Sequence, residues 1–265
     1  MLGFRTHPCD ERVYPDSHMS RVLRWRWLLV WLFVIASACS AHTQARPSKN
    51  RPLQYFFVLL KRPTSSPSIS KEASERLQEE HMANIRKLAA EHKLVMAGPF
   101  VDDTVLRGIF VLRAKSIVEA QQLVNVDPAV KAGRLSAEIH GPWFIDSNAI
   151  HEPNAAQQGM QQYTLVLLNR GEKWDPGTPE FRELVNQYPI FLKRMMSQGK
   201  VAVAGPFPFA VPDELRGVAI FRVPAEQATK LMQDDAAVKA GVLKLETHPW
   251  ITATGVLAPG LPTNN

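Results

Sequence analysis

The sequence predicts an α+β protein made of two tandem ferredoxin-like βαββαβ units. The main observation is an internal duplication: the run Asp127–Gly133 (DPAVKAG) returns 108 residues later as Asp235–Gly241 (DAAVKAG), and such a displacement is typical of repeated units. Three further pairs recur in the same order, namely Ala97–Phe100 with Ala204–Phe207, Leu106–Gly108 with Leu215–Gly217, and His140–Trp143 with His248–Trp250. The other two observations are the order of the segments within each repeat and the apolar character of each first strand.

The first repeat, residues 54–146, begins with an expected strand at residues 54–61 (QYFFVLLK). This strand is apolar on both faces, which indicates a central strand that is covered on both sides. A helix is expected over residues 70–92, because apolar residues and His81 recur there at helical spacing. The remaining expected elements are strands at 93–97, 107–113 and 135–143 and a helix at 116–124, which together give the βαββαβ order.

The repeated DPAVKAG run has a physical explanation of its own. Asp127 suits an N-cap, Pro128 the first helical position, and Gly133 the left-handed position after a helix end. The run therefore predicts a single helical turn, and we interpret it as shaping the backbone.

The second repeat, residues 162–252, copies this order of elements. Its strands are expected at 162–169, 200–204, 216–223 and 242–251, and its helices at 179–198 and 225–233. The polar residues 147–161 are expected to form a linker that lets the halves pack face to face. Residues 253–265 are expected to be a disordered tail.

The first fifty residues have the pattern of an export signal. Residues 1–18 are interpreted as preceding the true start at Met19. Residues 19–38 combine a cationic start, ten consecutive apolar residues and a small-residue cleavage site, which is typical of a signal peptide. The string ending at Cys39 resembles a bacterial lipobox, so lipid attachment at Cys39 and simple cleavage both stay open. Residues 39–53 are expected to be a polar tether in the periplasm or cell envelope.

Composition excludes several classes of function. The formal charge is +6, but the basic residues are interspersed and form no run, so a nucleic-acid partner is not expected. Two cysteines cannot supply a disulfide framework. Neither a phosphate-binding loop, a dinucleotide fingerprint nor a nucleophile motif is present, and no cofactor is expected. A membrane contact is expected only through a lipid on Cys39.

Four marks together resemble the YCII-related family of small bacterial proteins. They are a helix histidine seventeen residues before the glycine of an Ala-Gly-Pro turn (His81 to Gly98), an acidic loop after that turn, the DPxVxAG run, and a Pro-Trp at the end of the last strand. The resemblance covers both repeats. It implies a dimeric α+β barrel, in which two ferredoxin-like units press their sheets together. A tandem chain is expected to build that barrel from its own halves, and further oligomerisation stays open.

The resemblance also implies an acid–base pair of the helix histidine and a loop aspartate. In this chain the pair is His81 with Asp103 or its neighbour Asp102. The second repeat departs from the pattern, because Tyr188 stands at the position equivalent to His81. If catalysis exists, one half performs it and the other completes the barrel. Tyr188 is then either a ligand contact or a residue of the hydrophobic core.

Two repeated arginines are candidates for holding an anion. Arg107 and Arg216 each precede a glycine at the start of the third strand, and a guanidinium there could clamp a carboxylate. Gly98 and Gly205 of the Ala-Gly-Pro turns are the expected openings of the backbone toward a ligand. The alternative is that each arginine pairs with a surface acid such as Asp103.

Two further pairs, Glu138/His140 and Glu246/His248, each share one face of a strand. They could ligate a metal only if the strands met across the barrel, and the expectation is solvated residues without a metal. The leading hypothesis is an exported small-molecule-binding protein with lyase-, isomerase- or hydrolase-like proton transfer. The alternatives are a non-catalytic binding module of the cell envelope and a structural duplicate without a ligand.

Overall fold

The structure, a computed structural model, describes residues 52–151, 159–208 and 214–259. The chain divides into two compact units, Met1–Asn50 and Arg51–Asn265. The described residues all belong to the second unit, so the expected leader and Cys39 lie outside them. No helix in this described part is long and apolar enough to cross a bilayer.

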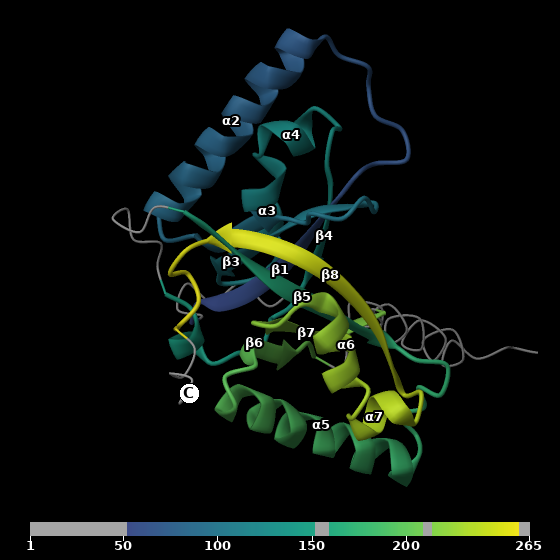
Figure 1. The fold of residues 1–265 in the computed structure, drawn as a ribbon. Helices are drawn as coiled ribbons and strands as arrows, with labels where there is room; N and C mark the ends of the chain where they lie inside the picture. The colour runs from purple at the N-terminus through teal and green to yellow at the C-terminus, as the bar shows by residue number, and fades with distance from the viewer. Residues whose placement is uncertain (1–51, 152–158, 209–213, 260–265) are drawn as a thin grey trace, which may run out of the picture. The chain divides into compact units, whose positions relative to one another are not determined.

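The first repeat forms a four-stranded antiparallel sheet with its helices on one face (Figure 1). The strand order is β2-β3-β1-β4, which is the arrangement expected of a βαββαβ unit. The strands are β1 (Gln54–Lys61), β2 (Leu94–Pro99), β3 (Leu106–Ala114) and β4 (Ser136–His140), and the helices are α2 (Lys71–Ala90), α3 (Ile117–Asn125), α4 (Pro128–Lys131) and the short 3-10 helix η1 (Ser147–Ala149).

The second repeat has the same topology, with the strand order β6-β7-β5-β8. Its strands are β5 (Met160–Arg170), β6 (Val201–Pro206), β7 (Leu215–Phe221) and β8 (Leu243–Ala253), and its helices are α5 (Pro179–Ser197), α6 (Ala225–Met232) and α7 (Ala236–Lys239). The prediction of two tandem ferredoxin-like units is confirmed.

The repeated DPAVKAG run forms the expected single turn. Asp127 accepts hydrogen bonds from the backbone N–H groups of Ala129 and Val130, and Asp235 caps α7 in the same way. Gly133 has a φ of 65°, a left-handed conformation that glycine adopts without a steric cost. Local chemistry therefore explains these two turns, although Asp127 has a second role described below.

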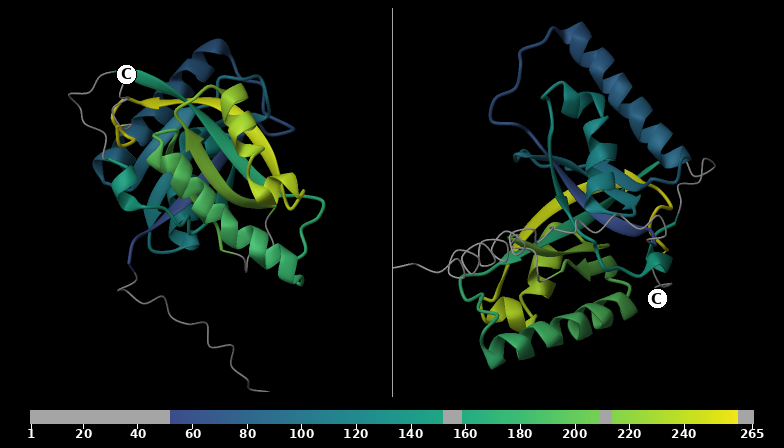
Figure 2. Two further views of the ribbon diagram at one scale, coloured as in Figure 1. Left: turned by 60° about the horizontal axis from the view of Figure 1, so that its bottom comes forward. Right: turned by 180° about the vertical axis from the view of Figure 1, so that it is seen from behind.

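The two sheets face each other, with the helices of each repeat on the outer sides (Figure 2). One hydrophobic core lies between the sheets and includes residues of both repeats, among them Phe57, Trp143, Leu165 and Trp250. Two separate cores lie between each sheet and its own helices. Each first strand is thus buried on both faces, as its apolar sequence predicts, and the intramolecular barrel-like pairing is confirmed.

The repeated Ala-Gly-Pro and Pro-Trp motifs contact each other across the two sheets. Trp250 donates from Nε1 to the carbonyl of Gly98 at 3.0 Å, and Trp143 donates to the carbonyl of Gly205 at 2.9 Å. A Cβ on Gly98 would lie 1.8 Å from the carbonyl oxygen of Ile251. On the side where a Cβ would point, the backbone of the other repeat covers each glycine, Ile251 over Gly98 and Phe144 over Gly205. That side of each glycine is therefore closed to a ligand.

Ala149 and Ile150, together with Val256 and Leu257, belong to the sheet–sheet core. Ile150 pairs with Leu257 in an isolated bridge, and Val256 is 1 % exposed. The expected linker and tail therefore differ from the structure at residues 149–150 and 253–257. The physical reason is that burying these short apolar stretches against the core is favourable. In the sequence the polar residues around them hide this apolar character.

Candidate functional site

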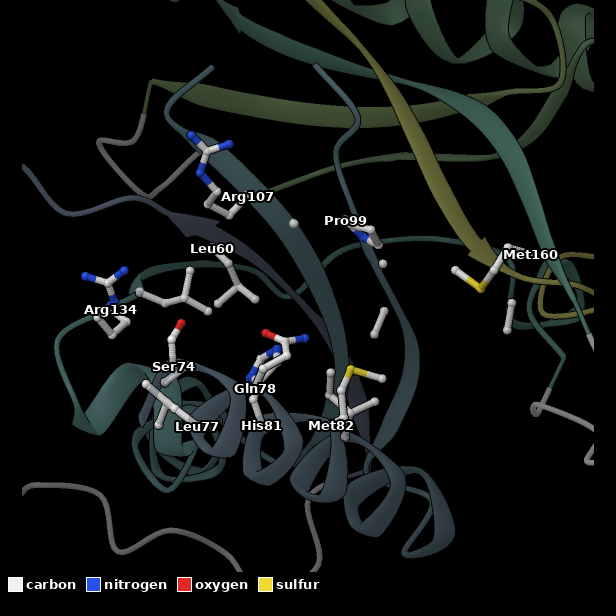
Figure 3. Close-up of a pocket in the computed structure, with 17 residues that line it drawn as sticks. Leu60, Ser74, Leu77, Gln78, His81, Met82, Pro99, Arg107, Arg134 and Met160 are labelled. Carbon is white, nitrogen blue, oxygen red and sulfur yellow. The ribbon is translucent and has the colours of Figure 1, made fainter. Parts of the chain in front are cut away.

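A pocket of about 530 Å³ lies between α2 and the sheet of the first repeat (Figure 3). Its volume lies in the usual range for small-molecule sites. The residues that matter most for its chemistry are Gln78, His81, Met82, Gly98, Arg107 and Arg134. Three of the predicted site residues, His81, Gly98 and Arg107, line this pocket.

His81 on α2 is paired with Asp127, the N-cap residue of α4. Its Nδ1 lies 2.9 Å from both carboxylate oxygens of Asp127, and its ring stacks on Phe110 with 5.9 Å between the centroids. Asn84, one turn along α2, donates to Oδ2 of Asp127 at 2.9 Å. Asp127 is fully buried, so four donors on α2 and α4 hold this carboxylate in place.

The partner of His81 is therefore neither Asp103 nor Asp102, and that part of the prediction is wrong. The reason is tertiary: α4 packs against α2 and brings Asp127 to the histidine. The loop after β2 instead runs toward the second repeat, where the N–H of Val101 donates to the carbonyl of Pro249 at 3.1 Å.

The electrostatics of the pair favour a charged carboxylate. Burial raises the pKa of Asp127. The hydrogen bond and charge of His81, with the hydrogen bonds from Asn84 and Val130, lower it by more, so the pKa lies below its ordinary value. An ionised carboxylate only accepts, so His81 donates through Nδ1. Nε2 is then the ring nitrogen with which His81 can meet a molecule in the pocket that it lines.

The equivalent position in the second repeat cannot do the same chemistry. Tyr188 and Phe191 replace His81 and Asn84, and the buried hydroxyl of Tyr188 makes no hydrogen bond. Burial and the nearby charge of Asp235 raise the pKa of Tyr188 well above its ordinary value. Burial also raises the pKa of Asp235. Tyr188 belongs to the helix–sheet core, and no described contact supports its predicted role in binding.

The two repeated arginines have different environments. Arg107 lines the pocket, and its buried Nη2 makes no hydrogen bond. Asp103 lies 3.7 Å from Nη2, but its side chain is 94 % exposed, and such a pair contributes little. Arg216 is 6 % exposed and lies over the ring of Trp174 at 5.5 Å. The predicted clamp thus fits Arg107, whereas an aromatic ring already occupies the face of Arg216.

The predicted loop acid Asp102 reaches the second repeat. Its Oδ2 lies 2.6 Å from Nδ1 of His248, whose Nε2 lies 3.0 Å from Oε1 of Glu246. His140 and Glu138 form the corresponding pair on β4, at 3.1 Å. Within the part of the chain that the structure describes, no three His, Cys, Asp or Glu residues are grouped so that they could hold a metal ion. Each Glu–His pair lies within one strand, and the contact of Asp102 with His248 is the one that joins the two repeats here.

The His248 cluster predicts a dependence of stability on pH. Burial lowers the pKa of His248, but the hydrogen bonds and charges of Glu246 and Asp102 raise it more, and the net pKa is raised. The stability it contributes is complete below the unfolded pKa of roughly 6.5 and is lost as pH rises through the folded pKa. We expect the free energy of unfolding in urea to fall as pH rises from the unfolded to the folded pKa of His248. In Asp102→Asn this dependence on pH should be weaker. The control is His151→Gln, a change at an exposed histidine. If the free energy of unfolding depends on pH equally in Asp102→Asn and the parent chain, the His248 cluster is not its source.

Sequence reasoning missed Asp127 and Asn84 as members of the site. The repeats nevertheless carry a signal, since the two positions of α2 that meet Asp127 both change in the second repeat, from His81 to Tyr188 and from Asn84 to Phe191. The two positions lie one helical turn apart and therefore share one face of α2.

Comparison with known proteins agrees with the fold and the motifs. The family model of the YCII-related domain matches residues 54–140. The uncharacterized protein YjpA of Bacillus subtilis (strain 168) is 38% identical over 64 residues, which are 23% of this chain and 73% of YjpA. The chain belongs to the YCII-related family. Within this YCII-related chain the matched segment is the repeat that carries His81 and Asp127.

Solved structures with a similar fold are much more distant in sequence. A chlorite dismutase variant from Candidatus Nitrospira defluvii is 9% identical, with a TM-score of 0.49 over 76% of this chain and 91% of that one. A heme-binding protein from Thermus thermophilus is 13% identical, with a TM-score of 0.45 over the same shares. At these values the likeness carries no argument about what the YCII-related chain binds.

Proposed function

We propose that the first repeat binds a small molecule between α2 and its sheet, and that His81 transfers a proton to or from this molecule. The observation that carries the proposal is the pairing of His81 with the buried Asp127 at the wall of a 530 Å³ pocket. A histidine that is oriented by a carboxylate and open to a pocket on its other side is a common arrangement for general acid–base chemistry.

In the proposed mechanism each member of the pair has its own role. Asp127 holds the proton of His81 on Nδ1, so the lone pair of Nε2 can accept a proton from a C–H or O–H group of the ligand. The negative charge of Asp127 then stabilises the imidazolium that forms. Nε2 returns the proton at a second atom of the same molecule in an isomerase, and to the leaving group in a lyase. In a hydrolase Nε2 takes the proton from a water that attacks the ligand and gives it to the leaving group.

The second repeat supports this site without repeating it. Tyr188 is a poor base near neutral pH because its pKa is raised. Ser74, which lines the pocket, is replaced by Phe181, and Phe181 packs edge-on against Trp174 at 4.7 Å between the ring centroids. The second half thus completes the barrel, and one chain carries one site.

The loss of the histidine in half of the chain also favours the alternative of a non-catalytic binding module. The two functions differ in what His81 contributes. A base in a catalysed proton transfer is worth about 10²- to 10⁴-fold in rate, whereas one contact in a binding site changes affinity by about tenfold.

The test is a screen of small metabolites by nitrogen-detected NMR of the histidine side chains, followed by assays of turnover for each molecule that shifts Nε2 of His81. We expect His81→Gln to lose turnover by at least about 10²-fold while the chain stays folded. Tyr188→Phe, the matched change in the second repeat, should leave turnover unchanged. A bound molecule whose conversion survives His81→Gln would leave only the binding module.

We further propose that the protein is exported and acts in the periplasm or at the cell envelope. The supporting observation is the signal-like sequence of residues 19–38 before Cys39. Fractionation of cells that produce the full chain and its Cys39→Ala variant tests this. Envelope association that is lost in Cys39→Ala supports a lipid anchor, a soluble periplasmic product supports simple cleavage, and a cytoplasmic product contradicts export.

A further inference from the structure

Two arginines lie at the same end of the pocket. Arg107 is flanked by Leu106 and Gly108, which pair with Lys61 and Leu60 at the end of β1. Arg134 lies two residues before Ser136, which pairs with the same Lys61 from the other side. Both arginines line the pocket, and Figure 3 shows them on the side away from Met160.

The positive charge at this end is incompletely balanced. Nη2 of Arg107 is buried without a hydrogen bond, and the carboxylate nearest to it is the exposed Asp103, at 3.7 Å. Arg134 donates from Nη1 to the neutral carbonyl of Pro67 at 2.9 Å. None of the described residues that line the pocket is acidic. A buried donor without an acceptor is costly, so this end of the pocket is suited to an anion.

The opposite end is apolar. Along α2 the lining residues run from Ser74 near the arginines, past Gln78 and His81, to Met82. The eight steps from Ser74 to Met82 span about 12 Å of helix. In Figure 3 Gln78 and His81 lie between the arginines and Met82, with Met160 beyond. Apolar residues such as Leu60 and Leu77 also line the arginine end (Figure 3), so the two ends differ in that only one of them carries cationic side chains.

The far wall comes from the second repeat. Met160 begins β5 and pairs with Ala253 at the end of β8, and both line the pocket of the first repeat. Methionine adapts its shape to apolar groups of different length. The second repeat therefore contributes to what the site accepts, although it lacks a histidine of its own.

We propose that the ligand of this pocket is an amphipathic organic acid. Its carboxylate lies between Arg107 and Arg134, and its apolar body extends past His81 toward Met82 and Met160. This inference rests on the proposed function and adds the class of the substrate and its direction in the site. The group that exchanges a proton with His81 is then a carbon or oxygen partway along the molecule, at a distance from the carboxylate.

The experiment is calorimetric titration of the full chain with straight-chain carboxylates from butanoate to decanoate and with their primary amides. We expect each acid to bind about tenfold or more tightly than its amide, and affinity to rise about fourfold per methylene until the chain reaches Met160. Arg134→Gln should remove the difference between acid and amide. Met160→Asp should weaken only the longest acids, and the exposed Lys131→Gln is the control for loss of a positive charge.

Equal binding of acids and amides, no binding of either series, or an equal effect of Lys131→Gln and Arg134→Gln would overturn the inference. These results are distinct from a failure of the proposed function. Neutral molecules that shift Nε2 of His81 and are turned over would leave the proton transfer standing while excluding the acid. If acids bind as expected but no reaction of theirs depends on His81, the class of ligand stands and the proton transfer by His81 is excluded.

Discussion

Replacing Gly98 by alanine is expected to lower the free energy of unfolding by more than about 3 kcal/mol, because the two sheets can no longer approach each other. The added Cβ would lie 1.8 Å from the carbonyl oxygen of Ile251. Since that atom belongs to the backbone of β8, no change of rotamer relieves the clash. The strands must separate, which also breaks the hydrogen bond from Trp250 to the carbonyl of Gly98.

The pseudo-symmetry of the chain supplies the comparison for this experiment. A Cβ on Gly205 would lie 2.0 Å from the carbonyl oxygen of Phe144, so Gly205→Ala should have a similar effect in urea unfolding. A Cβ on Gly177 would meet only the side chain of Asp175, at 3.2 Å, and Gly177→Ala should change the free energy of unfolding by less than about 1 kcal/mol. Equal stability of Gly98→Ala and Gly177→Ala would contradict the interface that is described here.

The matched substitutions Asp127→Asn and Asp235→Asn are expected to have opposite effects at neutral pH. Asparagine keeps the oxygen that caps the helix, so the change in charge is isolated. Asp127→Asn loses the hydrogen bond from Nδ1 of His81 to a charged carboxylate and should cost about 1.5–3 kcal/mol. The charge of Asp235 acts on Tyr188 instead, and burial raises the pKa of Asp235. Asp235→Asn should therefore leave stability unchanged or increase it.

The pH dependence of the two variants follows from the directions of the pKa shifts. The pKa of Asp127 is lowered, so its contribution is present above the unfolded pKa of roughly 3.9 and is lost as pH falls through the lower folded value. The pKa of Asp235 is raised, so its ionisation costs stability as pH rises through the folded value. Urea unfolding from acidic to neutral pH measures both, and a stabilising Asp127→Asn or a strongly destabilising Asp235→Asn at pH 7 would be the contrary result.

The assignment of Asp127 shows why a local reading of a motif is incomplete. Its place before Pro128 explains an N-cap fully, and the structure confirms the cap. The carboxylate nevertheless has a second pair of partners, His81 and Asn84, more than forty residues earlier in the chain. An N-cap uses part of the accepting capacity of a carboxylate, and the remainder is free to accept from whatever helix packs against it.

Much of the fold could be predicted from the sequence alone, because the repeat and its alternation of elements are local properties of the chain. The duplication, the doubly apolar first strands and the capping residues of the DPAVKAG run together determined two βαββαβ units. The difference between His81 and Tyr188 likewise indicated a single site in the first repeat. These features depend on spacing and backbone preference, which a sequence displays directly.

Only the tertiary structure decided which side chains meet. The packing of α4 on α2 pairs His81 with Asp127, while the loop after β2 carries Asp102 across to His248. The sheet–sheet interface explains why Gly98 lacks a side chain. The start of β5 places Met160 at the pocket of the other repeat. Such contacts join segments far apart in the chain, and their partners depend on the packing of whole elements, which residue spacing does not encode.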